Sequence, residues 1–131
     1  MTYKLMIPGT MPNLNDYLHG ERMGTKSNGK CTTVGNSLKQ KWQYEVIKII
    51  RKSLKATKLQ EPIRLSYKYY EPNEDRDLDN ICSFAHKVIQ DALVQTQSIE
   101  DDGWKNIKGF SDEFFIDKDN PRIEVTIEEV V

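Results

Sequence analysis

Cysteine is scarce in this chain of 131 residues, and a long apolar run is missing altogether. The two cysteines, Cys31 and Cys82, stand far apart without a CxxC pair, and no histidine lies at zinc-finger spacing. Neither a disulfide framework nor a structural zinc site is indicated, which fits a reducing compartment. The N-terminal MTYKLMIPGT offers only a short apolar stretch before Pro8. We therefore expect a cytoplasmic protein without a membrane segment or signal peptide.

The charge of the chain is nearly balanced overall but divided along its length. Residues 1–58 contain 11 Lys or Arg and 3 Asp or Glu, whereas residues 59–131 contain 8 and 17, so the two parts carry net charges of +8 and −9. This division favours a basic binding surface beside an acidic site, although uneven surface charge without function explains it equally well. The length and a hydrophobic share of 37% predict one domain over residues 1–131.

Hydrophobic periodicity predicts an α+β domain, in which a small mixed sheet packs against two long helices. The predicted elements are strands at 2–7, 63–69 and 123–127 and helices at 37–57 and 81–93. Asn36 or Ser37 is available as the N-cap of the first helix. A polar loop with several glycines is expected from residue 8 to residue 36, and the stretches WKNIKGF and DEFFID are interpreted as short strands or irregular structure.

Three aspartates, Asp75, Asp77 and Asp79, crowd together at the start of the second helix. An aspartate there caps free N–H groups and opposes the positive end of the helix dipole, which explains one of the three. Two carboxylates a few ångströms apart repel each other by about 1 kcal/mol in water. A cation that neutralises the cluster is therefore a second explanation.

The spacing of these aspartates discriminates between two hard cations. Calcium in an EF-hand would need a glycine where Asn80 stands and a bidentate acid where His86 stands, so this reading fails. Magnesium needs fewer carboxylates and keeps several waters, which leaves room for a phosphate. The cluster therefore favours Mg²⁺, the usual metal of nucleases.

Several segments together resemble the RusA-type Holliday junction endodeoxyribonucleases, especially their phage and prophage branch. They are PNLNDY at 12–17, RDLDN at 76–80, DAL at 91–93, EDDGW at 100–104 and PRIEVTI at 121–127. The resemblance thus extends over nearly the whole chain. It implies a homodimeric endonuclease of a bacterial host cell, encoded by a phage or prophage, that resolves four-way or branched DNA in recombination and repair with Mg²⁺, or Mn²⁺ as a substitute, and no small-molecule cofactor.

The resemblance also implies which residues form the catalytic site. Asp77, Asp79 and Asp102 match the family's three metal ligands, and Asn80 matches the asparagine that follows them. The family's essential lysine falls on Ser83, which is a departure from the pattern. Lys87 lies about one helical turn further on and is expected to supply the missing ammonium group; an ion pair between Lys87 and Asp91 is the other explanation.

Five residues are expected to bind DNA. They are Asn15, Arg76, Lys41, Lys48 and Lys52. The three lysines form a stripe on the polar face of the first helix, which suits a phosphate backbone but is also the ordinary composition of a solvated helix face. A non-catalytic protein that binds branched DNA, with the same fold, stays open because of Ser83.

A histidine, a tryptophan and a group of tyrosines are interpreted separately from the proposed catalytic site. His86 is expected to be a partly exposed polar residue rather than a general base. Trp104 is expected to pack beneath Asp102 or at a subunit contact. Of Tyr67, Tyr69 and Tyr70, at least two are expected in the core because residues alternate along their strand; a surface on which DNA bases stack is the other explanation.

Overall fold

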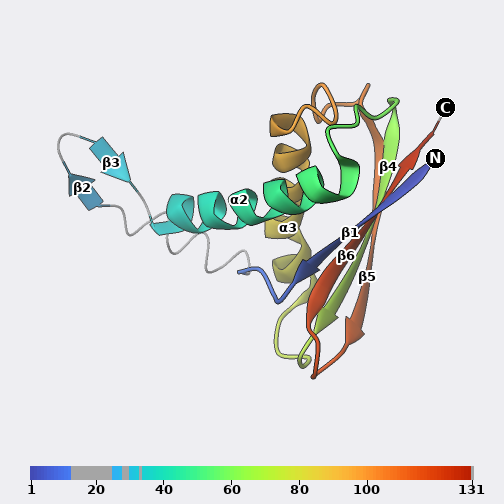
Figure 1. The fold of residues 1–131 in the computed structure, drawn as a ribbon. Helices are drawn as coiled ribbons and strands as arrows, with labels where there is room; N and C mark the ends of the chain where they lie inside the picture. Colours follow the sequence, from blue (N-terminus) through green and yellow to red (C-terminus); the bar gives the residue numbers. More distant parts are fainter. Residues whose placement is uncertain (13–24, 28–29, 33, 131) are drawn as a thin grey trace.

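A computed structural model of the protein describes residues 1–12, 25–27, 30–32 and 34–130. These residues form strands and helices in the order β1 (Thr2–Pro8), β2 (Thr25–Ser27), β3 (Lys30–Thr32), α2 (Val34–Leu54), β4 (Ile63–Glu71), α3 (Leu78–Gln95), β5 (Ile107–Ile116) and β6 (Arg122–Glu129). The four longer strands form one mixed sheet, and Figure 1 shows both helices on the same face of it. The predicted α+β fold with a mixed sheet against two helices is confirmed.

The strand order of the main sheet is β1-β6-β4-β5. β6 pairs antiparallel with both β1 and β4, whereas β4 and β5 run parallel. The ends of β4 and β5 that follow Tyr70 and Phe115 therefore lie side by side, and the chain leaves β4 there to enter α3. This topology sets the acidic segment 72–79 at one end of the sheet.

The core lies between the sheet and the two helices. In β4 every second side chain, from Ile63 through Tyr67 and Tyr69 to Glu71, is buried, as the alternating pattern predicts. The buried positions of α3 recur at helical spacing, and they are Ile81, Phe84, Ala85, Val88, Ile89, Ala92 and Leu93. Full burial of one large aliphatic side chain contributes about 1.5–3 kcal/mol, so this stripe fixes α3 firmly on the sheet.

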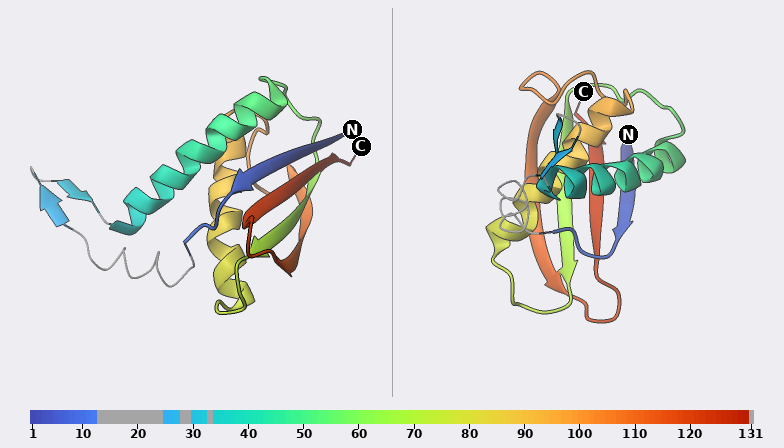
Figure 2. Two further views of the ribbon diagram at one scale, coloured as in Figure 1. Left: turned by 60° about the horizontal axis from the view of Figure 1, so that its bottom comes forward. Right: turned by 90° about the vertical axis from the view of Figure 1, so that its left-hand side faces the viewer.

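The first helix differs from its predicted bounds at both ends. α2 begins at Val34, so Asn36 and Ser37 lie inside the helix and the prediction that either is its N-cap is wrong. The helix ends at Leu54, because Lys55 and Ala56 have positive φ angles of 50° and 63° and leave the right-handed helical region. The segment predicted as a loop contains the antiparallel hairpin of β2 and β3, which stands off the sheet beyond the first turn of α2 (Figure 2).

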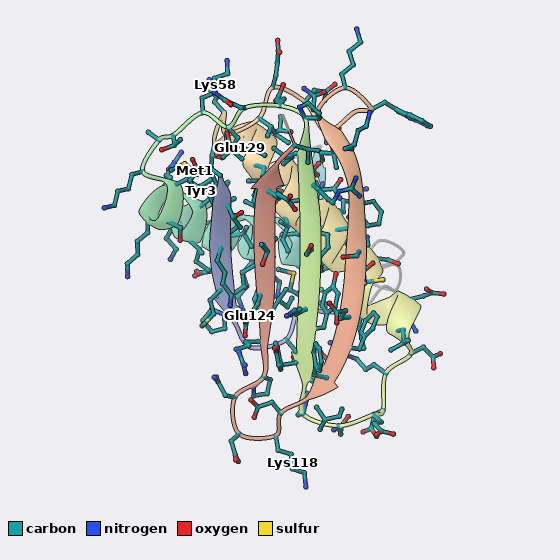
Figure 3. The ribbon with its side chains drawn as sticks, turned by 90° about the vertical axis from the view of Figure 1, so that its right-hand side faces the viewer. Met1, Tyr3, Lys58, Lys118, Glu124 and Glu129 are labelled. Atoms are coloured by element: carbon teal, nitrogen blue, oxygen red, sulfur yellow. The ribbon has the colours of Figure 1, made fainter. Side chains whose placement is uncertain are left out.

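The segment before β6 was the least determined by sequence. Most of the two stretches interpreted as short strands or irregular structure forms a single strand, β5, which is the edge strand next to β4, while Trp104, Lys105 and Asn106 form a turn before it. The other face of the sheet carries none of the helices that the structure describes, and Figure 3 looks onto it. Neither α2 nor α3, the helices that the structure describes, is long and apolar enough to cross a membrane.

Candidate metal and nucleic-acid site

The loop between β4 and α3 is held in place by Arg76. The guanidinium donates two hydrogen bonds to the Glu71 carboxylate, at 2.9 and 2.8 Å, and a third to the carbonyl of Met11 at 2.7 Å. Glu71 is only 5% exposed, so this bidentate ion pair is largely shielded from water. Arg76, which we expected to bind DNA, thus makes protein contacts that fix the acidic loop to the end of β4.

Asp77 and Asp79 project into solvent at the start of α3. Asp77 occupies the N-cap position, but its side chain makes no capping hydrogen bond, and Asp79 stands in the first turn. Both side chains are exposed, and no described residue donates a hydrogen bond to either carboxylate. Capping therefore does not account for Asp77, and the positive end of the helix dipole favours the charge of both groups. Their oxygens remain available to a cation.

Asp102 lies at the other end of the same helix. It lines a cleft of about 610 Å³ together with Asp91 and Gln95 from the last turns of α3 and Tyr44 from α2. Because α3 contains 18 residues, its ends are about 27 Å apart. Within one chain, Asp102 is therefore not brought beside Asp77 and Asp79, contrary to the expectation of a single cluster.

The two aspartates of the acidic turn have different surroundings. The Asp101 carboxylate accepts a hydrogen bond from the backbone N–H of Asp102 at 2.9 Å and so shapes the turn. The carboxylate of Asp102 accepts no hydrogen bond from the described residues. The next residue but one, Trp104, is 97% exposed, so the expectation that it packs beneath Asp102 is wrong.

The lysine position of α3 is occupied by a structural hydroxyl. Ser83 donates to the carbonyl of Asp79 at 2.6 Å, a helix-internal bond that presents no cation. Lys87 stands one turn further along α3 with an exposed side chain. Asp91, the alternative partner of Lys87, is bound by Lys39 from α2 at 2.8 Å. Asn80 is half-buried in the first turn beside Asp79.

The predicted basic stripe is present on α2. Lys41, Lys48 and Lys52 are exposed, and their spacing of seven and four residues puts them along one side of the helix. Lys48 contacts Glu45 at 3.1 Å and lies 4.9 Å over the Tyr44 ring. Asn15 lies outside the residues that the structure describes.

One group of potential ligands was missed by sequence reasoning. Among the described residues, only Cys82, His86 and Asp112 place ligand atoms within 4.8 Å of one another. His86, which was predicted to be partly exposed, is 18% exposed and lies 2.6 Å from Asp112. The i, i+4 spacing of Cys82 and His86 on a helix was the available signal. Asp112 on β5, however, lies 26 residues beyond His86 in sequence.

These features define a class of protein. This small α+β domain exposes two carboxylates at a helix start that accept no hydrogen bond from a described residue, and it exposes lysines along a neighbouring helix. Such an arrangement is suited to hydrolysis of a nucleic-acid backbone. The family model described as Endodeoxyribonuclease RusA matches residues 19–128, and the chain belongs to this family of endodeoxyribonucleases. The matched range contains all three predicted metal ligands. A search among curated proteins gives no match.

Proposed function

We propose that the protein is a Mg²⁺-dependent endonuclease that binds four-way or branched DNA as a homodimer and cuts two symmetry-related strands. The observation that carries this proposal is the family match over residues 19–128, which includes Asp77, Asp79 and Asp102. Membership in a Holliday junction resolving family supports the substrate class. The metal, the dimer and the paired incisions are proposed in addition to what the family match supports.

The donor set at the start of α3 fits magnesium. Mg²⁺ prefers carboxylate oxygens and retains several waters, and the Asp77 and Asp79 carboxylates are exposed without hydrogen bonds from described residues. When bound, the ion supplies a Lewis acid that polarises the phosphate and lowers the pKa of a water. Mn²⁺ has the same ligand preference and is expected to substitute. The glutamate of β4 does not compete as a ligand, because Arg76 engages both oxygens of Glu71.

The position of Asp102 supports a site shared between subunits. Asp77 and Asp79 lie at one end of α3 and Asp102 at the other, so two copies with antiparallel α3 helices would bring Asp102 of the partner subunit to the Asp77 and Asp79 pair. A two-fold axis makes two such sites, which matches paired incision of a two-fold junction. Trp104, almost fully exposed beside Asp102, has the size and exposure of an interface anchor.

The remaining site residues act on the DNA. Lys87, exposed two turns after Asp79, would neutralise charge on the phosphate oxygens, a role that Ser83 cannot take. Asn80 would orient the DNA or a water beside Asp79 through its amide. Lys41, Lys48 and Lys52 would bind phosphates along α2, so binding would weaken steeply with salt. The carboxylates repel DNA until a metal neutralises them.

A cleavage assay tests the activity. The full chain is incubated with a synthetic four-way junction and with linear duplex of the same sequence, in Mg²⁺, Mn²⁺ or Ca²⁺. We expect paired nicks in the junction with Mg²⁺ and Mn²⁺, and binding without nicks in Ca²⁺. Asp79→Asn should bind the junction in Ca²⁺ and leave it intact in Mg²⁺. Cleavage by this variant at the wild-type rate would refute the metal assignment.

Complementation tests the shared site. In a mixture of Asp79→Asn and Asp102→Asn chains, each mixed dimer has one intact site if the site combines the two subunits, and none if each site lies within one chain. We therefore expect either variant alone to be inactive and the mixture to make single nicks. A mixture as inactive as its components, with subunit exchange shown by differently tagged chains, would rule out the shared site.

A second function, binding of branched DNA without cleavage, is favoured by one observation. Ser83 replaces the family's lysine and its hydroxyl is directed to the Asp79 carbonyl. Tight junction binding in every metal without any nick would support this alternative. Cleavage that is lost in Lys87→Met but retained in Lys87→Arg would exclude it.

A further inference from the structure

Cys82, His86 and Asp112 form a cluster on the helix-covered side of the sheet. Cys82 and His86 are one turn apart on α3, and Asp112 extends toward them from β5. His86 Nε2 lies 2.6 Å from Asp112 Oδ1, and the three ligand atoms lie within 4.8 Å of one another. We propose that these three residues bind a transition-metal ion of the Zn²⁺ type, at a site that shares no residue with the proposed magnesium site.

The donor set selects the metal. A thiolate, an imidazole and one carboxylate suit Zn²⁺, Co²⁺ or Ni²⁺, whereas Mg²⁺ requires oxygen ligands in an octahedron. Three protein ligands leave a fourth position for water, and the side chains of His86 and Asp112 are 18% and 20% exposed, so solvent reaches them. A metal would replace the hydrogen bond between Nε2 and Oδ1, with an increase in their separation.

The surroundings hold two of the ligands in place. The His86 ring packs against the rings of both Tyr67 and Phe110, with centroid distances of 4.6 and 4.5 Å. The hydroxyl of Tyr69, a fully buried residue, donates to Asp112 Oδ1 at 2.9 Å. A hydrogen bond of this kind to a ligating carboxylate orients it and raises metal affinity. The imidazole and the carboxylate are therefore preorganised.

The carboxylates around Cys82 favour a cation at the cluster, whereas burial opposes the charged thiolate. Burial, and then the nearby carboxylates of Asp112 and Asp79, raise the pKa of the Cys82 thiol. The thiolate is therefore disfavoured while the cluster is without a cation, and a divalent ion reverses the balance by offsetting the negative charge. Binding would release the thiol proton.

The ion would link α3 to the edge strand of the sheet. β5 is paired on one side only, with β4. A metal bridge from Asp112 to two residues of α3 would add a second attachment, close to the turn that carries Asp79. We expect zinc to raise the thermal midpoint by several degrees, since a ligand that binds only the native state stabilises it.

Cobalt spectroscopy on the full chain is the direct test. The protein is stripped with a chelator and titrated with Co²⁺, whose bond to a thiolate gives a near-ultraviolet charge-transfer band; displacement by Zn²⁺ is followed by calorimetry. We expect one ion per chain and the band in the wild type. Cys82→Ser should lose the band, and Asp112→Asn should bind at least about 10-fold more weakly.

Matched variants separate this site from the others in the chain. Cys31→Ser removes the other thiol of the chain but retains Cys82, so it should keep the band. The double variant Asp77→Asn with Asp79→Asn should also keep it. Tyr69→Phe, which leaves all three ligands in place, should weaken binding by about 10-fold. Absence of stoichiometric binding in the wild type, or a band that persists in Cys82→Ser, would overturn the proposal. Loss of the band in the double aspartate variant would also overturn it, because the ion bound by Cys82 would then depend on the ligands of the proposed magnesium site.

Discussion

Arg76 and Glu71 form a bidentate ion pair that joins the end of the acidic loop, just before α3, to the last residue of β4. The pair lies five residues apart in sequence and is largely shielded, with Glu71 only 5% exposed. The aspartates that follow it therefore start from a fixed point on the sheet. A role in positioning the site and a role in binding DNA make different predictions for Arg76.

Replacement of Arg76 by alanine is expected to destabilise the fold. It leaves the Glu71 carboxylate buried without its cation, which costs about 3–5 kcal/mol for a shielded pair. Chemical denaturation measures this change, and Arg76→Ala with Glu71→Gln should recover part of it because the uncompensated charge is gone. A variant with wild-type stability but a smaller salt dependence of DNA binding would show instead that Arg76 contacts phosphate.

The lysine stripe of α2 is expected to carry part of the DNA affinity. Each phosphate contact that is removed should reduce the slope of log K against log salt by about 0.9 on duplex arms. Lys41→Ala and Lys52→Ala should each do so, whereas Lys48→Ala should cost less because Lys48 already pairs with Glu45. Junction binding is measured at several salt concentrations in Ca²⁺.

Lys118 provides the matched control for the stripe. It is exposed in the turn before β6, at the end of the uncovered face of the sheet, where Figure 3 labels it. Lys118→Ala removes the same charge from the chain as the helix variants do. An equal reduction of the salt slope in Lys118→Ala would mean that net charge, rather than α2, determines the affinity.

The elements that the sequence predicted well are those whose burial follows one period. The apolar residues of α3 recur every three or four positions, and those of β4 at every second one, because each element turns one continuous face to the core. β5 has no such pattern, since it is an edge strand with exposed Phe110 and Ile116. Its pairing with β4 depends on contacts between distant segments.

The resemblance to the family proposed residues for the candidate site but not their arrangement. The motif located Asp77, Asp79 and Asp102, but the separation of Asp102 from the other two follows from the length and straight course of α3. Spacing in sequence gives no direct measure of that distance. His86 and Asp112 meet only because the parallel register sets Asp112 opposite Tyr67, on the side that faces α3.

Stability is expected to fall in acid partly through Glu124. This residue of β6 accepts hydrogen bonds from Lys4 and Arg122, which lower the pKa of its carboxyl below the ordinary value of 4.5. A lowered native pKa gives stability that is present above pH 4.5 and is lost as the pH falls through the native value. Figure 3 shows Glu124 on the uncovered face of the sheet.

Replacement of Glu124 by glutamine tests this contribution. At neutral pH it should cost about 1 kcal/mol, because solvent screens the exposed Lys4. The difference from wild type should shrink as the pH falls through the lowered native pKa of Glu124, below which both proteins carry a neutral side chain. Glu128→Gln, on the same face of β6, has no ion pair with a described residue and should cost less. A pH-independent difference for Glu124→Gln would exclude the charged interaction.

The final prediction separates the neighbouring acids Asp101 and Asp102. Asp101 shapes the turn by accepting a hydrogen bond from the Asp102 N–H, and an asparagine carbonyl can accept the same bond. Asp101→Asn should therefore cleave junctions at close to the wild-type rate. Asp102→Asn loses a metal-ligand charge and should cleave at least about 100-fold more slowly, while it still binds the junction in Ca²⁺. Both variants change the net charge equally. A similar loss of cleavage in the two would therefore attribute the effect to the charge of the acidic turn and would contradict the role of Asp102 as a metal ligand.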